Sequence, residues 1–364
     1  MKVEFSVLGR LYSKYQSEFE EAALRALRSG WYILGNELTK FENEFAAYHG
    51  VKHCAGVGNG LDALRLAITA MGVGTGDEVI VQTNTFIATA LAIMQTGATP
   101  VFVDVDNFFG IAPEGIVKAI SERTKAIIAV HLYGQPCDMD AIITIAKNNN
   151  LHVIEDCAQA HGAKYKGKLV GTFGDAGCFS FYPTKPVGAF GDAGAVITNN
   201  DELDEKVRMI RNYGSKMKYQ HEIIGINSRM DEIQAAITSV ALKHIEDGNK
   251  ERKSIAWKYI NGIKNPLVLL PKLRPHSDHI FHVFAVLCIE RDRLLNFLDE
   301  NGIHAQIHYP IPCHLADCYS YLGYNAGDIP VSESFANHEL SLPIYSGMPE
   351  DEINYVIEVI NMFI

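Results

Sequence analysis

The sequence predicts an α/β fold, with a large domain built on a mostly parallel sheet covered by helices and a smaller C-terminal α/β domain. First, apolar strand-like runs alternate with helical patterns through the first two-thirds of the chain, which is typical of such sheets. Second, 364 residues exceed what one simple core usually holds. Third, polar residues gather directly after the strand candidates, at the edge where these sheets bind ligands.

The elements of the large domain are defined by short apolar runs and by helical periodicity between them. The strand candidates cover residues 51–57, 79–82, 100–103, 126–130, 151–155, 177–181 and 193–198. The helix candidates between them cover residues 61–71, 87–96, 114–121 and 139–149. Polar segments follow three of the strands, at 83–86, 131–135 and 156–161, so we expect them to share one edge of the sheet.

A longer helical tract, 230–246, leads into a charged stretch, 247–253, which we interpret as the connection between the domains. We therefore expect a large domain over 1–248, with an N-terminal helical segment, and a small domain over 249–364. The small domain contains a strand candidate at 281–289, a helix at 292–301, a His- and Pro-rich loop at 307–315 and a closing helix at 349–362.

Composition excludes several classes of protein. Hydrophobic residues make up 48% and charged residues 21%, as in soluble globular proteins, and no apolar run reaches the length of a membrane span. The net charge of −11 argues against a nucleic-acid partner, although a local anion site is still possible. The seven cysteines form no C-x-x-C pair, so we expect reduced thiols, no metal and a cytoplasmic location.

Lys185 and Asp156 are the most informative pair of residues. Lys185 follows an apolar strand candidate, precedes Pro186 and has glycines nearby, which favours a buried loop. Enzymes that use pyridoxal 5′-phosphate (PLP) need a lysine amine to hold the cofactor as a Schiff base and a carboxylate to pair with its pyridinium nitrogen. The alternatives are a solvated surface lysine and an aspartate that caps a helix.

Three further segments fit the same cofactor. The turn Gly58-Asn59-Gly60 opens a helix candidate, where free N–H groups and the helix dipole favour a phosphate. Ser180 could donate its hydroxyl to that phosphate, and Phe86 could stack on the pyridine ring. Each also has an ordinary explanation: a common strand–helix turn, a serine at a strand end and a core aromatic.

The roles of other polar residues are open from the local sequence. Gln159 could reach the ring oxygen of the cofactor. His161 could line the substrate side or bond to a nearby backbone group. Asn227 and Ser228 begin the tract 230–246, so either could simply cap that helix.

Seven blocks in order make the chain resemble the DegT/StrS-type nucleotide-sugar aminotransferases, a branch of the fold-type I PLP enzymes. The blocks are GWYILG (30–35), GVGNGLDAL (56–64), TFIAT (85–89), HLYGQ (131–135), EDCAQAHGA (155–163), SFYPTK (180–185) and GINSRMDEIQAA (225–236). The resemblance extends over nearly the whole chain.

The resemblance implies a role for each cofactor residue. Lys185 would carry PLP and move protons, and Asp156 would hold the pyridinium nitrogen. The other implied contacts are the ring hydroxyl (Gln159), the phosphate (Ser180 with the turn Gly58-Asn59-Gly60), the ring face (Phe86) and the phosphate of the neighbouring subunit's cofactor (Asn227). The last contact implies a homodimer with shared active sites.

The resemblance also suggests residues for the substrate. His308, Tyr309 and His314 lie in a segment similar to the sugar-side loop of relatives, and Arg229 is a candidate for the diphosphate of a nucleotide sugar. GNGL replaces a Ser-Gly-Thr turn of many relatives, and KPVG replaces their Lys-Asn-Leu-Gly.

Together with HLYGQ, the GNGL turn is similar to the sub-branch that aminates C3 of thymidine-diphosphate 3-keto-6-deoxyhexoses, with glutamate as amino donor. Three alternatives remain: amination at C4 of a 4-keto sugar, a PLP sugar dehydratase and a non-catalytic regulator. Dehydratases replace the lysine or use an iron–sulfur cluster, whereas this chain keeps Lys185 and lacks clustered cysteines. A regulator would be favoured by loss of Lys185 or Asp156.

Overall fold

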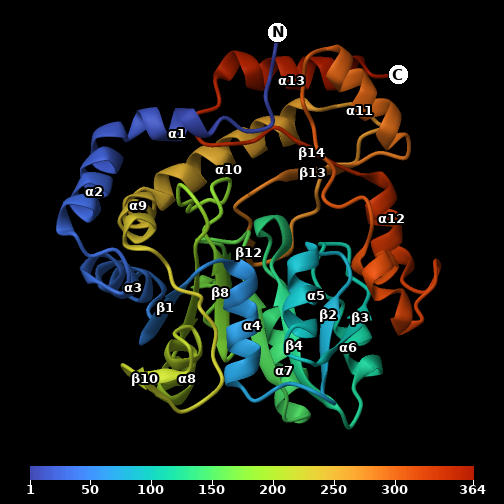
Figure 1. The fold of residues 1–364 in the computed structure, drawn as a ribbon. Helices are drawn as coiled ribbons and strands as arrows, with labels where there is room; N and C mark the ends of the chain where they lie inside the picture. Colours follow the sequence, from blue (N-terminus) through green and yellow to red (C-terminus); the bar gives the residue numbers. More distant parts are fainter.

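The computed structural model describes residues 1–364, and its large domain is built around a seven-stranded sheet (Figure 1). The strand order is β1-β9-β8-β5-β4-β2-β3, and only β9 runs against its neighbours. The strands are β1 (His53–Val57), β2 (Glu78–Gln82), β3 (Thr99–Val103), β4 (Thr124–Val130), β5 (His152–Asp156), β8 (Ala176–Ser180) and β9 (Gly194–Thr198). The predicted mostly parallel α/β sheet is therefore confirmed.

Helices cover both faces of the sheet, because the strands are apolar on both sides. In β2, Val79 and Val81 join one apolar cluster, whereas Ile80 between them joins another. The first cluster includes residues of α4 (Gly60–Ala70), α5 (Ile87–Met94) and α8 (Asp201–Ile210). The second includes residues of α6 (Pro113–Ala119) and α7 (Met139–Asn148). Sheets buried on both faces read as nearly continuous apolar runs, as these strands do.

Three N-terminal helices precede the sheet, and the long helix after it corrects one expectation. The helices α2 (Gln16–Ser29) and α3 (Asn36–His49) pack against α9 (Glu232–Lys243), and α1 (Leu8–Lys14) precedes them. The charged stretch 247–253 is not a linker, because it lies within α10 (Ile245–Gly262). Its charges lie mainly on the exposed face, while Asn249 and Arg252 point inward. The expected boundary at 248/249 thus falls inside a helix, and the division remains a prediction.

The C-terminal part has its own apolar cluster of 23 residues. It contains β13 (Phe284–Leu287) paired with β14 (Glu339–Leu342), together with α11 (Arg291–Glu300), α12 (Pro330–His338) and α13 (Glu350–Met362). The predicted strand, helix, loop and closing helix are all present, whereas α12 and β14 were not predicted. Val3 joins this cluster and bridges to Ile303, so the two ends of the chain meet here.

The remaining elements are short. They are β6 (Lys164–Tyr165), β7 (Lys168–Leu169), β10 (Ser215–Met217), β11 (Gln220–His221), β12 (Ser277–Asp278), and the 3₁₀ turns η1 (Leu132–Gly134), η2 (Cys313–Leu315) and η3 (Asp317–Leu322). None of the helices combines the length and apolarity that crossing a bilayer requires.

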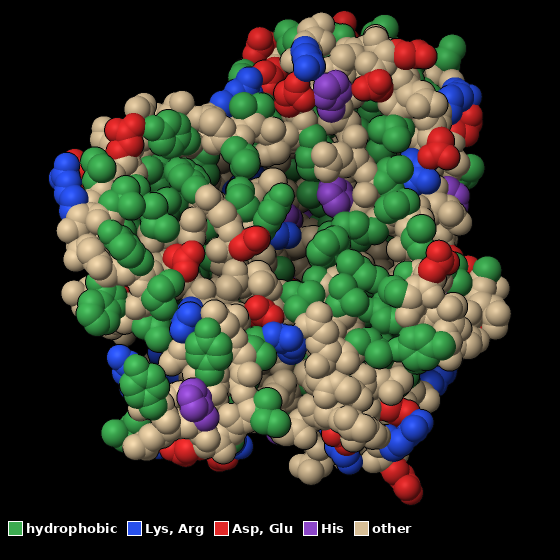
Figure 2. Space-filling model, in the orientation of Figure 1, with side chains coloured by type: hydrophobic (Ala, Val, Ile, Leu, Met, Phe, Trp, Pro, Cys, Tyr) green, Lys and Arg blue, Asp and Glu red, His purple; other side chains and the backbone are tan.

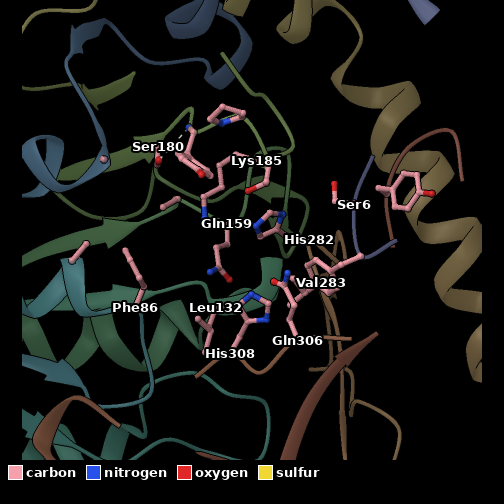
Figure 3. A pocket seen from close by; sticks show the side chains of 18 of the residues that line it. Ser6, Phe86, Leu132, Gln159, Ser180, Lys185, His282, Val283, Gln306 and His308 are labelled. Carbon is pink, nitrogen blue, oxygen red and sulfur yellow. Dashed lines mark hydrogen bonds between the residues drawn. The ribbon is translucent and has the colours of Figure 1, made fainter. Parts of the chain in front are cut away.

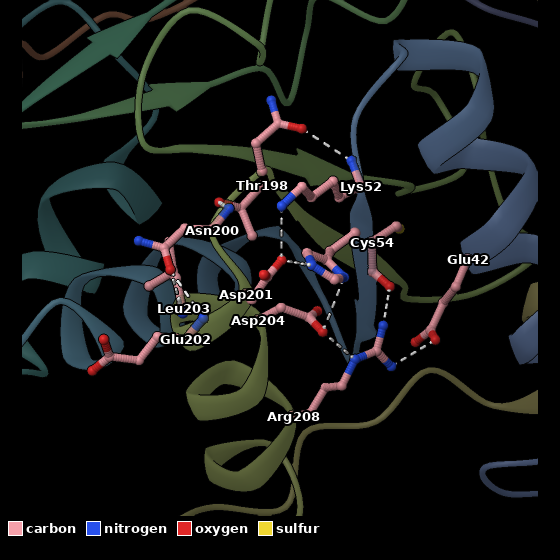
Figure 4. Close-up of polar contacts among 12 residues, drawn as sticks. Glu42, Lys52, Cys54, Thr198, Asn200, Asp201, Glu202, Leu203, Asp204 and Arg208 are labelled. Atoms are coloured by element: carbon pink, nitrogen blue, oxygen red, sulfur yellow. Dashed lines mark hydrogen bonds and ion pairs between the residues drawn. The ribbon is translucent and has the colours of Figure 1, made fainter.

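A largely buried ion-pair network, with Arg208 at its half-exposed end, ties β1 to the helices beside it (Figure 4). Glu42 of α3 accepts from Arg208 at 2.8 Å and from Arg211 at 2.6 Å, and the same carboxylate accepts the Gly56 N–H at 2.9 Å. Arg208 also donates to the Cys54 carbonyl and to Asp204. The network therefore fixes the strand that leads into the turn Gly58-Asn59-Gly60.

Six of the seven cysteines are buried, and all seven are free thiols. Burial raises the pKa of the Cys54, Cys157 and Cys178 thiols well above the usual value. Cys318, in η3, is the exposed one.

Candidate active site

A cavity of about 1060 Å³ opens beyond the carboxyl ends of the strands, where the large domain meets the C-terminal part and the N-terminal segment. Figure 2 shows the molecule hollowed near the middle of this face, with hydrophobic side chains around the opening. Nine of the predicted site residues line it: Asn59, Gly60, Phe86, Asp156, Gln159, Ser180, Lys185, and His308 with Tyr309 from the C-terminal loop. Strand ends far apart in sequence thus converge on one space.

Lys185 reaches the cavity from the loop after β8 (Figure 3). Its backbone N–H donates to the Tyr182 carbonyl at 2.8 Å, which holds the loop in a turn. Burial lowers the pKa of Lys185 to about 8, and only Asp156 opposes this by favouring the charged amine. The interpretation as a solvated surface lysine is therefore wrong. An amine with a lowered pKa is uncharged more often near neutral pH and can attack a carbonyl.

Asp156 is the last residue of β5, and its carboxylate is held on both oxygens. The Thr89 hydroxyl donates to Oδ2 at 2.8 Å, and the Ala158 N–H donates to Oδ1 at 3.1 Å. Burial raises the pKa of Asp156, while these two bonds and the positive charges of Lys185 and His131 oppose the rise. No helix begins after Asp156, so the helix-cap interpretation is wrong.

The turn between β1 and α4 offers a site for a phosphate. Asn59 caps α4 by accepting the Asp62 N–H at 2.8 Å, and the first N–H groups of the helix have no partner inside it. Ser180 approaches this turn so closely that a Cβ on Gly60 would lie 2.5 Å from the Ser180 Cβ. Only glycine lets the serine hydroxyl and the helix end share one anion. Gly58 does not line the cavity, and its N–H donates to Ser228 Oγ at 3.0 Å.

Phe86 and Gln159 complete the part of the cavity expected to hold a ring. Phe86 is 52% exposed and lies 5.5 Å from Tyr309 between ring centroids, so it forms a free aromatic wall and not a core contact. Gln159 accepts from the Tyr133 N–H at 2.7 Å and donates to the Tyr309 hydroxyl at 3.1 Å. A lysine, a carboxylate, an anion site and an aromatic wall in one cavity fit PLP.

His131 and Glu155 form a fully buried pair with an Nε2–Oε2 distance of 3.0 Å, and the charge of His131 acts on Asp156. The Glu155 carboxylate also accepts N–H groups of Gly171, Phe173 and Gly174 at 2.7–2.8 Å. Cys157 lies near enough to complete a possible metal-ligand trio, but the carboxylate is already saturated by four donors. We therefore interpret the pair as structural.

Two predicted substrate residues are wrong. His161 is fully buried against Phe179 and Phe181 and does not line the cavity. His314 is also buried, with Nδ1 2.8 Å from Thr83 Oγ1 and Nε2 3.2 Å from Glu333. In both cases the ring is used to fill the interior, so it cannot reach a ligand.

Arg229 and Asn227 also lie outside the cavity of the single chain. Arg229 donates to Asn212 Oδ1 at 2.9 Å and lies over the Tyr213 ring, while Asn227 is exposed. The expected contact of Asn227 with a neighbouring subunit's cofactor and that of Arg229 with the substrate diphosphate both remain predictions.

Several cavity residues were not predicted from the sequence: Ser6, Thr89, Arg252, His282, Tyr345 and Ser346. Thr89 could have been found, because it lies three residues after Phe86 on the first turn of a helix that starts at this edge. Arg252 was not predicted because it lies in the charged stretch 247–253, which was interpreted as a connection between domains.

A half-buried lysine and a buried carboxylate share one cavity with a free helix N-terminus, which is the arrangement that a PLP-dependent enzyme needs. The family model described as "DegT/DnrJ/EryC1/StrS aminotransferase family" matches residues 13–361, and the chain belongs to this family. It is therefore a PLP-dependent sugar aminotransferase, as the resemblance implied.

Three relatives illustrate the similarity. The chain is 49% identical over 362 residues, 99% of each chain, to "dTDP-3-amino-3,6-dideoxy-alpha-D-galactopyranose transaminase" of Aneurinibacillus thermoaerophilus. The structure of DesV from S. venezuelae has a TM-score of 0.97 and 44% identity, covering 99% of this chain and 98% of that one. The structure of NtdA from Bacillus subtilis "with bound cofactor pmp" has a TM-score of 0.92 and 31% identity, covering 99% and 84%.

Proposed function

We propose that this enzyme transfers an amino group from glutamate to C3 of a thymidine-diphosphate 3-keto-6-deoxyhexose. The observation that carries the proposal is the complete set of Lys185, Asp156 and the anion site in one cavity. The position on the sugar is supported by the 49% identity to a transaminase whose name specifies a 3-amino-3,6-dideoxy sugar.

Each residue has a defined task in this reaction. When bound, PLP supplies an electron sink that makes the carbon next to the nitrogen acidic. The Lys185 amine removes the proton from the α-carbon of the donor and later returns a proton to the sugar carbon. The Asp156 carboxylate, held by Thr89, keeps the proton on the ring nitrogen. Because Lys185 approaches from one side, the amino sugar forms with one configuration.

The loop with His308 and Tyr309 is placed to meet the sugar. The Tyr133 hydroxyl donates to the His308 carbonyl, and Tyr309 contacts Gln159, so the loop is tied to the large domain. Both side chains line the cavity close to Lys185.

The expected outcome of the substrate test is amination at C3. Thymidine-diphosphate 3-keto-6-deoxyglucose and its galacto epimer are each incubated with the holoenzyme and glutamate, and the product is analysed by NMR. A nitrogen on C3 with one configuration supports the proposal. A higher kcat/KM for the 4-keto isomer would assign the enzyme to C4, leaving its aminotransferase activity unaffected.

We propose that the working unit is a homodimer with shared active sites. Figure 2 shows hydrophobic side chains gathered on the side where α2 and α3 lie. Large exposed residues there include Leu24, Leu27, Trp31, Tyr32 and Ile33. Contiguous exposed apolar surface of this kind is typical of an interface. Asn227 is free on the surface to enter the site of a second chain.

Mixing two inactive variants tests the shared site. Lys185→Ala and Asn227→Ala subunits are combined in equal amounts and allowed to exchange. Each mixed dimer then holds one site with both groups intact, so roughly a quarter of the wild-type sites should return. Each variant alone is the control. No recovered activity, with exchange shown by mass spectrometry, would contradict sharing.

A further inference from the structure

Arg252 is a buried arginine that lacks an anionic partner. It lies on the inward face of α10, is 7% exposed and lines the active-site cavity. Burial lowers the pKa of Arg252 to about 10, and the Glu251 carboxylate, which favours the charged guanidinium, acts only through its charge and not through a hydrogen bond. At neutral pH the guanidinium is still charged. A buried charge without a partner is strongly unfavourable, so an anion from outside the chain would complete this site.

The neighbouring carboxylates are used elsewhere. Glu251 pairs with Lys14 at 2.6 Å and accepts from Ser346 and from the Gly347 N–H at 3.0 Å. Three carboxylates line the cavity, and none of them pairs with Arg252. Glu4 bonds to Lys2 and His304, and Asp156 is held by Thr89 and Ala158. The third, Asp192, is exposed.

A second polar group in the cavity also lacks a partner. The Nδ1 atom of His282 is buried and makes no hydrogen bond. Figure 3 shows His282 and Lys185 directed into the same space, with His308 nearby. Burial and the positive charges of Lys185 and Arg252 lower the pKa of His282 well below its usual value, so the ring is neutral and can donate one N–H. Free donors therefore exceed free acceptors here.

The surroundings leave room for a small planar anion at Arg252. Gly248, one helical turn earlier, places no side chain on this flank; a Cβ there would lie in ordinary contact, 3.5 Å from Arg252 Nη1 and 3.9 Å from Ser346 Oγ. The cofactor phosphate does not need Arg252, because it has its own site at Ser180 and the start of α4. A guanidinium binds a carboxylate through two parallel hydrogen bonds.

We propose that Arg252, assisted by His282, binds a carboxylate of the amino donor and selects a dicarboxylic amino acid. The inference rests on the proposed function only for the identity of that donor. A single carboxylate fits a buried guanidinium, whereas a nucleoside diphosphate must extend toward the cavity mouth. Arg252 is thus a specificity-determining residue, and Lys185 remains the group that moves the proton.

The direct test measures binding of glutarate, which has two carboxylates and no amino group, to the PLP-loaded enzyme by calorimetry. Arg252→Gln should weaken glutarate binding by roughly 10- to 100-fold, as expected for loss of hydrogen bonds to a charged group. Arg252→Lys should recover part of the affinity. Lys250→Gln removes a charge from the exposed side of the same helix and should leave binding unchanged.

Kinetics separate the two substrates. In single turnover, Arg252→Gln should raise the glutamate concentration for half-maximal rate by a similar factor, with a smaller change in the limiting rate. Binding of thymidine diphosphate should not change. Unchanged glutarate affinity would overturn the proposal, and so would a loss confined to thymidine diphosphate, which would assign Arg252 to the nucleotide.

Wild-type protein provides an independent test if the variants fail to fold. Glutarate should protect Arg252 from an arginine-specific reagent such as phenylglyoxal, with the modified peptide identified by mass spectrometry. Modification of Arg252 at the same rate with and without glutarate would overturn the inference. A wrong assignment of the sugar changes none of these readouts, and a donor other than glutamate would be evident from the wild-type half-reaction alone.

Discussion

Lys185→Ala is expected to abolish amino transfer while the protein still binds cofactor and substrate. The variant loses both the covalent link to the cofactor and the amine that moves the proton, and the proton transfer alone contributes about 10²- to 10⁴-fold. Wild-type enzyme should be yellow, and borohydride reduction should fix the cofactor on Lys185, as shown by peptide mapping. The variant should show no single-turnover reaction with glutamate. A label on any other lysine would refute the assignment.

Asp156→Asn is expected to slow the half-reaction with glutamate by about 10²- to 10³-fold, roughly 3–4 kcal/mol of transition-state stabilisation. Asparagine keeps the shape and can still bond to Thr89, but it lacks the negative charge that keeps the ring nitrogen protonated. Stopped-flow absorbance measures this step without any sugar substrate. Asp140→Asn, an exposed carboxylate on α7, is the matched control. Near-normal rates in Asp156→Asn would contradict the proposed role of the Asp156 charge in keeping the ring nitrogen protonated.

The cofactor side of the site could be predicted because its residues follow strands directly. Asp156 ends β5 and Ser180 ends β8, and Gly60 begins the helix after β1. In a mostly parallel sheet, chain order alone brings such positions to one edge. Local patterns of strand, turn and helix were therefore sufficient to predict the residues on the cofactor side of the cavity.

The substrate side depends on contacts between distant segments, which local patterns do not report. His161 and His314 have the chemistry of ligands, but packing turns their rings into the interior. Arg252 lies in a run of charged residues that is typical of an exposed linker, but its position on α10 points its side chain inward. Val3 pairs with Ile303 across almost the whole chain, so no local pattern indicates that the first residues belong beside the C-terminal cluster.

The distribution of the thiols makes the native protein its own reporter of unfolding. A thiol reagent needs access to the sulfur, so it should modify the exposed Cys318 quickly and the six buried cysteines only when the chain opens. Counting labelled sulfurs over time would then distinguish local from global opening. Cys54 reports on β1, Cys178 on β8 and Cys288 on the C-terminal cluster, without any engineered probe.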